Sequence, residues 1–98
     1  MTRIELYLTK ANPDDLSVDG AVLDVGGAVM QDHVKASLGD GDKLTLKSGL
    51  YTFMFSVPVP ATLTIHVIDA DTHASLQVAK PIDATLHRDS RTYSFVVP

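Results

Sequence analysis

The chain has 98 residues, of which 45% are hydrophobic and 20% charged, a balance that is typical of one globular domain and excludes a disordered chain. It contains no cysteine, which excludes disulfides, zinc–thiolate sites and cysteine nucleophiles. Twelve acidic and eight basic residues give a formal charge of −4. The lysines and arginines are scattered, so the sequence lacks the basic stripe that a nucleic-acid surface needs.

The first residues, MTRIELYL, do not form a secretory leader, because Glu5 interrupts the apolar run that such a leader requires. No stretch approaches the length of a transmembrane helix. We therefore expect no membrane insertion, and a protein that is cytoplasmic by default or exported without a Sec leader.

Near the N-terminus, Ile4, Leu6 and Leu8 alternate with polar residues, which predicts a half-buried strand. The Asn-Pro-Asp-Asp sequence at 12–15 favours a turn, and a second apolar run follows at 21–25. Residues 28–38 fit either a helix or a strand. We favour a strand, because the GDGD sequence that follows is typical of a hairpin loop.

Beyond residue 42 the strand pattern is stronger. Alternating apolar and polar residues, bounded by turn residues, predict strands at 43–47, 50–57, 62–69, 75–80, 84–86 and 91–97. Seven or eight short strands at regular spacing predict an all-β fold: an antiparallel β-sandwich with Greek-key connections, immunoglobulin-like or transthyretin-like, occupying residues 1–98 as a single domain.

The alternation within LYTFMFSV assigns Phe53 and Phe55 to the core of a central strand. Several apolar residues fall on the opposite faces of their strands, where a free monomer would leave them partly exposed: Val22, Met54, Ile68 and Val96. This distribution indicates self-association or a covered second face. We also expect a positive φ at Gly49, in a tight turn before that strand.

The segment DKLTLKSGLYTFMFSV resembles part of the transthyretin-like and carboxypeptidase-regulatory-like β-sandwich modules. Their Leu-x-Leu-x-x-Gly-x-Tyr-x-Phe pattern is matched by Leu44, Leu46, Gly49, Tyr51 and Phe53, and would mark a hairpin. The match covers about a sixth of the chain. The resemblance implies a Greek-key sandwich used for structure, adhesion or binding, and it implies no catalytic residues.

Three potential metal ligands, Asp69, Asp71 and His73, alternate within VIDADTHASL. An EF-hand loop beginning at Asp69 would require Gly and Glu where Ala74 and Lys80 stand, so that type of calcium site is excluded. We predict a polar turn at 69–74 between two strands, with no metal. A calcium site shared with the acidic residues at 14, 15, 40 and 42 is the alternative.

The remaining chemistry is sparse. The histidines at 33, 66, 73 and 87 show no metal-ligand spacing, and no nucleophile-elbow or phosphate-binding motif occurs. We therefore assign no catalytic, cofactor-binding or metal-binding residue and expect no cofactor. The sequence favours a non-enzymatic interaction or structural module, with a protein partner or with itself. The alternatives are a calcium- or carbohydrate-binding module and, more remotely, a small hydrolase.

Overall fold

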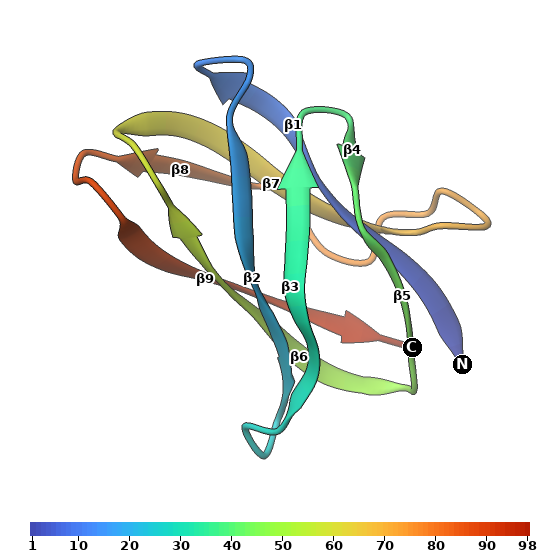
Figure 1. The fold of residues 1–98 in the computed structure, drawn as a ribbon. Helices are drawn as coiled ribbons and strands as arrows, with labels where there is room; N and C mark the ends of the chain where they lie inside the picture. The colour runs from blue at the N-terminus through green and yellow to red at the C-terminus, as the bar shows by residue number, and fades with distance from the viewer.

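Nine strands and no helix make up the structure, a computed structural model that describes residues 1–98 (Figure 1). The strands are β1 (Thr2–Asn12), β2 (Ser17–Asp24), β3 (Val29–Ser37), β4 (Asp40–Gly41), β5 (Lys43–Leu46), β6 (Gly49–Val57), β7 (Ala61–Asp69), β8 (Lys80–Ala84) and β9 (Asp89–Val97). The segment 28–38 is thus a strand, as predicted, and not a helix. The structure has no helix long and apolar enough to span a membrane.

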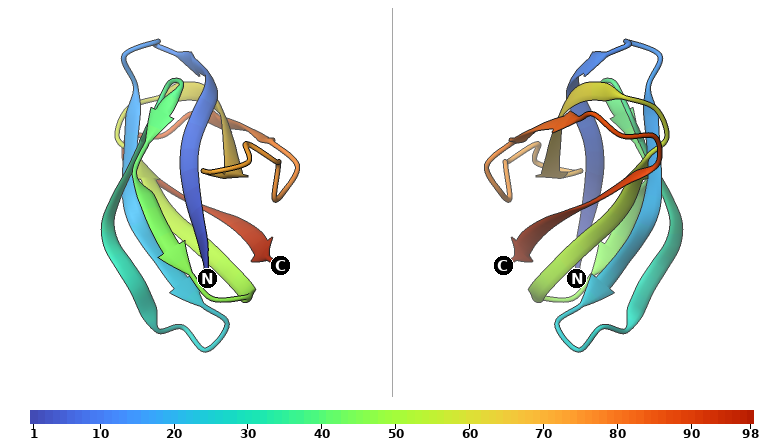
Figure 2. Two further views of the ribbon diagram at one scale, coloured as in Figure 1. Left: turned by 90° about the vertical axis from the view of Figure 1, so that its right-hand side faces the viewer. Right: turned by 90° about the vertical axis from the view of Figure 1, so that its left-hand side faces the viewer.

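The strands form two sheets, each antiparallel throughout its ladders (Figures 1 and 2). Sheet A has the strand order β5-β1-β7-β8, and sheet B has the order β4-β3-β2-β6-β9. The apolar residues of both sheets alternate with polar ones, so each sheet turns one apolar face toward the other sheet. The predicted antiparallel β-sandwich is confirmed.

The core lies between the two sheets and consists of apolar side chains only. Phe53 and Phe55 lie on β6, an interior strand of sheet B, with 0% and 3% exposure, and their rings stack at 5.0 Å. Both core assignments are therefore correct. From sheet A, alternate residues of β1 and β7 fill the opposite side, including Leu6, Leu8 and Ile65.

Connections that look like hairpins in the sequence instead cross from one sheet to the other. The pattern Leu44 to Phe53 belongs to β5 and β6, which lie in different sheets, so the predicted hairpin is wrong. In the GDGD segment, Gly39 lies in the two-residue turn of the short hairpin β3–β4, so the hairpin prediction is correct there. The segment then leads from β4 in sheet B to β5 in sheet A and does not pair residues 43–47 with β3. Turn residues determine where a strand ends. The strand with which the next one pairs depends on residues that are distant in the sequence.

The region after residue 74 also differs from the prediction. Within residues 75–79 only Ser75 makes a bridge, to Ile68, and the expected strand at 75–80 is absent apart from Lys80, which opens β8. Val78, expected on an apolar face, is 79% exposed. The strand that pairs with β7 is β8, in which Ile82 and Ala84 are buried.

Two of the four apolar residues expected to be partly exposed are buried. Val22 has 0% exposure and Ile68 has 8%. Val22 lies at an irregularity of the β2–β3 ladder, and Ile68 is next to the last residue of β7. At such places the strict alternation of inward and outward side chains breaks down. Met54 and Val96 are about half exposed, at 49% and 51%, as expected. Gly49 has the predicted positive φ, but its value of +157° is close to the extended range, and the residue opens β6 rather than forming a tight turn.

The two sides of the sandwich are joined differently. On one side, the amide of Gly39 donates to the carbonyl of Leu8 over 2.7 Å, and Leu8 forms a parallel bridge with Leu38. On the other side, β8 and β9 are linked through side chains. Tyr93 donates its hydroxyl to the carbonyl of Val78, and Arg91 donates to the carbonyl of Asp83.

Candidate interaction surface

The turn at 69–74 is built by its own side chains. Oδ1 of Asp69 accepts hydrogen bonds from the amides of Asp71 and Thr72, at 2.8 and 3.1 Å. These two amides hold the pKa of Asp69 below its ordinary value of 3.8. Asp71 points elsewhere, since its Oδ1 accepts a 2.6 Å hydrogen bond from Arg3 on β1. A polar turn is therefore present at 69–74, but Asp69 alone caps its backbone, Asp71 does not, and the strand expected directly after it is absent. In Figure 1 the turn lies within the extended orange loop.

The other acidic loop residues are also engaged locally. Asp42 accepts the amide of Lys35 over 2.8 Å, and Asp40 accepts the amide of Gly41 over 3.0 Å. Nowhere do three His, Asp or Glu side chains gather in a geometry that would hold a metal ion. The acidic loops considered as an alternative calcium site are thus not brought together.

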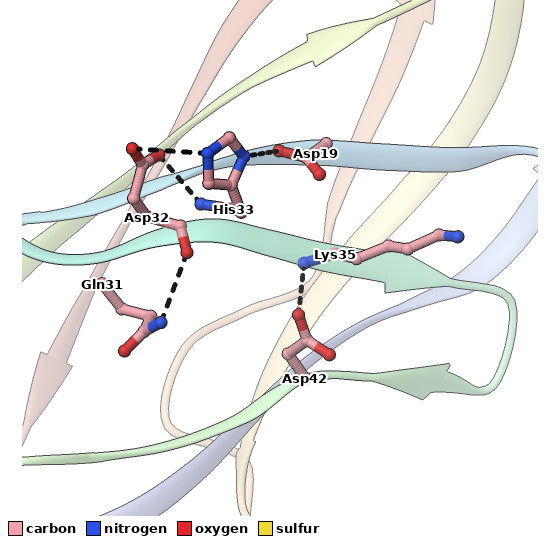
Figure 3. A network of polar contacts seen from close by, with 6 residues as sticks. All are labelled: Asp19, Gln31, Asp32, His33, Lys35 and Asp42. Carbon is pink, nitrogen blue, oxygen red and sulfur yellow. Dashed lines mark hydrogen bonds and ion pairs between the residues drawn. The ribbon is translucent and has the colours of Figure 1, made fainter.

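The most concentrated polar cluster lies on β2 and β3 (Figure 3). The ring of His33 stands between two carboxylates, with Nδ1 3.9 Å from Asp19 and Nε2 3.8 Å from Asp32. His33 is 85% exposed and has a φ of 53°, at an irregular part of β3. These distances exceed hydrogen-bond length, so the cluster amounts to exposed ion pairs that form when the ring is protonated.

A second histidine makes contacts that the sequence did not reveal. Nε2 of His66 lies 2.7 Å from Oγ of Ser75, and Nδ1 lies 3.4 Å from the hydroxyl of Tyr7. The Ser75 hydroxyl also lies 2.9 Å from the carbonyl of Gln77, to which it can donate. These contacts join the loop at 75–77 to His66 on β7. His66 and Ser75 meet because Ile68 bridges to Ser75, which no local pattern indicates.

The outer faces of the two sheets differ in chemical character. The outer face of sheet A carries mainly polar and charged residues: Arg3, Glu5, Tyr7, Thr62, Thr64 and His66. The outer face of sheet B carries a group of apolar residues that we call the apolar patch: Ala21, Leu23, Val29, Leu50, Met54 and Val96. Nothing within the chain covers this patch.

Strand register makes the apolar patch continuous across four strands. Leu50 on β6 lies directly opposite Val96 on β9, and Met54 lies opposite Ala21 on β2. Leu23 lies opposite Val29 on β3. The exposures of Leu50, Met54, Val96 and Val29 are 48%, 49%, 51% and 55%. Because directly opposed side chains on one face of a sheet are in contact range, these residues form a single surface rather than isolated apolar side chains.

The centre of the patch is a pair of hydroxyl groups. Oγ1 of Thr52 and Oγ of Ser94 lie 3.1 Å apart across β6 and β9, between the Leu50–Val96 pair and Met54. This hydrogen bond satisfies two polar groups on an otherwise apolar surface. Comparison of the chain with known protein families, with characterised proteins and with solved structures found no significant match.

Proposed function

We propose that this protein is a non-enzymatic β-sandwich module that binds a protein partner through the apolar patch on the outer face of sheet B. The observation that carries the proposal is the contrast between the two outer faces: sheet A presents polar residues, whereas sheet B presents the half-exposed pair Leu50 and Val96 and, beyond the Thr52–Ser94 pair, half-exposed Met54 opposite Ala21. A contiguous apolar surface rimmed by polar groups is the usual mark of a protein-binding site.

The arrangement of polar groups supports a binding role over an enzymatic one. Asp40 and Asp69 bond to amides of their own turns, Asp42 bonds to the amide of Lys35 on β3, and the Ser75 hydroxyl contacts the carbonyl of Gln77 as well as His66. The resemblance to transthyretin-like and carboxypeptidase-regulatory-like modules points in the same direction, since those sandwiches serve structure, adhesion or binding.

Met54→Asp tests the proposal, because it places a charge within the patch on a residue that is already half exposed. Thr64→Asp, on the outer face of sheet A and opposite Lys10, is the matched control. Proteins captured from the source cells by the wild-type chain are identified, purified and titrated against all three forms. We expect at least one partner whose affinity falls about tenfold or more for Met54→Asp and stays unchanged for Thr64→Asp. Partners that bind all three forms equally would contradict the assignment of the patch.

A further inference from the structure

The four edge strands of the two sheets differ in how well they are protected against pairing with another chain. At the edges of sheet A, β5 has only four residues, and β8 has five and contains Pro81. At the edges of sheet B, β4 has two residues, whereas β9 has nine and contains neither proline nor lysine. Short strands and proline or lysine within the strand are usual protections of a sheet edge, and β9 lacks them. The protection of its edge comes instead from side chains of the preceding segment, Gln77 and Lys80.

Four residues of β9 direct their main chain toward the open edge. The carbonyl of Thr92 accepts Nζ of Lys80 over 3.0 Å, and the carbonyl of Ser94 accepts Nε2 of Gln77 over 3.3 Å. These donors approach from the side of β9 away from β6, so both carbonyls face the edge. The amide and carbonyl of one residue point to the same side of an antiparallel strand, and alternate residues behave alike. Ser90, Thr92, Ser94 and Val96 therefore present both groups outward.

We propose that β9 pairs antiparallel with β9 of a second copy of this chain, joining two B sheets into one continuous sheet. The inference goes beyond the proposed function, because it depends on the free edge of β9 and not on the outer face.

Two copies of this edge can pair about a two-fold axis that passes between their Tyr93 residues. Only with the axis at Tyr93 does each of the four edge-facing residues lie opposite another edge-facing residue: Thr92 opposite the second copy's Ser94 position, and Ser90 opposite its Val96 position. Each such pair exchanges two main-chain hydrogen bonds, giving about eight in total. No like charges face each other, and opposed threonine and serine hydroxyls are a favourable cross-strand pair.

The side chains of Gln77 and Lys80 regulate access to this edge. A groove of about 420 Å³ separates residues 77–81 from residues 92–94, and both side chains reach across it to the two carbonyls. Tyr93 and Arg91 also reach from β9 to the carbonyls of Val78 and Asp83. Pairing requires all four of these contacts to open. Gln77 and Lys80 are exposed, so they can form hydrogen bonds with water instead once displaced.

Sedimentation velocity over a concentration series tests the dimer with the wild-type chain and two variants of one position. Thr92→Pro removes an edge-facing amide that makes no bond to β6, and Thr92→Val keeps that amide. We expect a concentration-dependent dimer for wild type and Thr92→Val, and at least tenfold weaker association for Thr92→Pro. Gln77→Ala combined with Lys80→Ala should strengthen association several-fold.

Because the chain has no cysteine, a cross-link tests the register independently of whether Thr92→Pro folds. A mixture of Thr92→Cys and Ser94→Cys chains should form a mixed disulfide under mild oxidation, since directly paired residues lie within disulfide range. Each variant alone should cross-link far less.

A chain that stays monomeric up to millimolar concentration overturns the proposal, and so does a dimer that ignores Thr92→Pro and shows no preference for the mixed disulfide. Met54→Asp separates the two ideas: it should weaken binding at the apolar patch about tenfold or more, while the dimer persists.

Discussion

Nη2 of Arg3 lies 2.6 Å from Oδ1 of Asp71, which ties the first strand to the turn that follows β7. Both side chains are well exposed, at 49% and 64%, so water and salt screen the pair. We expect Asp71→Ala to lower the free energy of unfolding by less than about 1 kcal/mol. A double-mutant cycle with Arg3→Ala in urea measures the coupling, which should shrink further in high salt.

Asp69 should matter more than Asp71 to the stability of the same turn, and its effect should depend on pH. Its folded pKa lies below the ordinary 3.8, because the amides of Asp71 and Thr72 stabilise the carboxylate. Its contribution is therefore fully present above the unfolded pKa and is lost as the pH falls through the folded pKa. The melting temperature of wild type should exceed that of Asp69→Asn at neutral pH, and the gap should close in strong acid. A gap that stays constant with pH would show that the charge is irrelevant.

Phe53 and Phe55 should be the most sensitive positions of β6. Each ring is nearly inaccessible and packs on the other, so Phe53→Ala or Phe55→Ala should cost about 3–5 kcal/mol through lost burial and a residual cavity. Met54→Ala, between them but on the outer face, should cost less than about 1 kcal/mol. Chemical denaturation of the three variants measures these differences. A loss below about 1 kcal/mol for both phenylalanine variants would falsify the inward assignment.

Gly41 marks a close approach of β4 to β1. A Cβ added there would overlap the carbonyl of Leu6, which is main chain and cannot rotate away. We expect Gly41→Ala to destabilise the fold by about 1–3 kcal/mol. At Gly26 the nearest atom to an added Cβ is a side-chain oxygen of Asp24, 3.4 Å away, so Gly26→Ala serves as the control. Equal melting temperatures for the two variants would contradict the packing of β4 on β1.

Burial raises the pKa of Tyr93 to about 12. Since this folded pKa exceeds the unfolded value of 10.0, the stabilising contribution is complete below pH 10 and is lost as the pH rises toward 12. Tyr93→Phe removes the ionisable group, so its stability should fall less steeply over that interval. Melting curves of both proteins between pH 9 and about 12 provide the comparison. Parallel curves would mean that another group causes the alkaline loss.

Local sequence pattern predicted the strands well and their partners poorly. The alternation in LYTFMFSV identified the inward residues of β6, because a period of two depends only on strand geometry. The step from Leu46 to Leu50 looked like a hairpin, yet β5 pairs with β1, where Leu44 lies opposite Ile4. That choice depends on residues at the other end of the chain, which no local window contains.

The same limit applies to the candidate surfaces. Met54 and Val96 were recognised as outward-facing from alternation alone, but their joining into one patch depends on the pairing of β2, β6 and β9. The open edge of β9 could not be foreseen, because a strand is at an edge only when no other strand pairs with it. Val78 was assigned to a strand because it is apolar, but the ladder with β7 begins only at Lys80 and includes Pro81, so Val78 lies outside it.

The pairing of β1 between β5 and β7 has a consequence for folding kinetics. Leu6 lies opposite Val67, so the ladder at the centre of sheet A joins residues far apart in the chain. Closing such a loop costs entropy before any contact compensates for it, which slows folding. During synthesis, β2 and β3 can pair as soon as both have emerged, whereas β1 can pair with β5 on one edge but must wait for β7 on the other. Through that interval the second edge of β1 is open to pairing with the wrong chain.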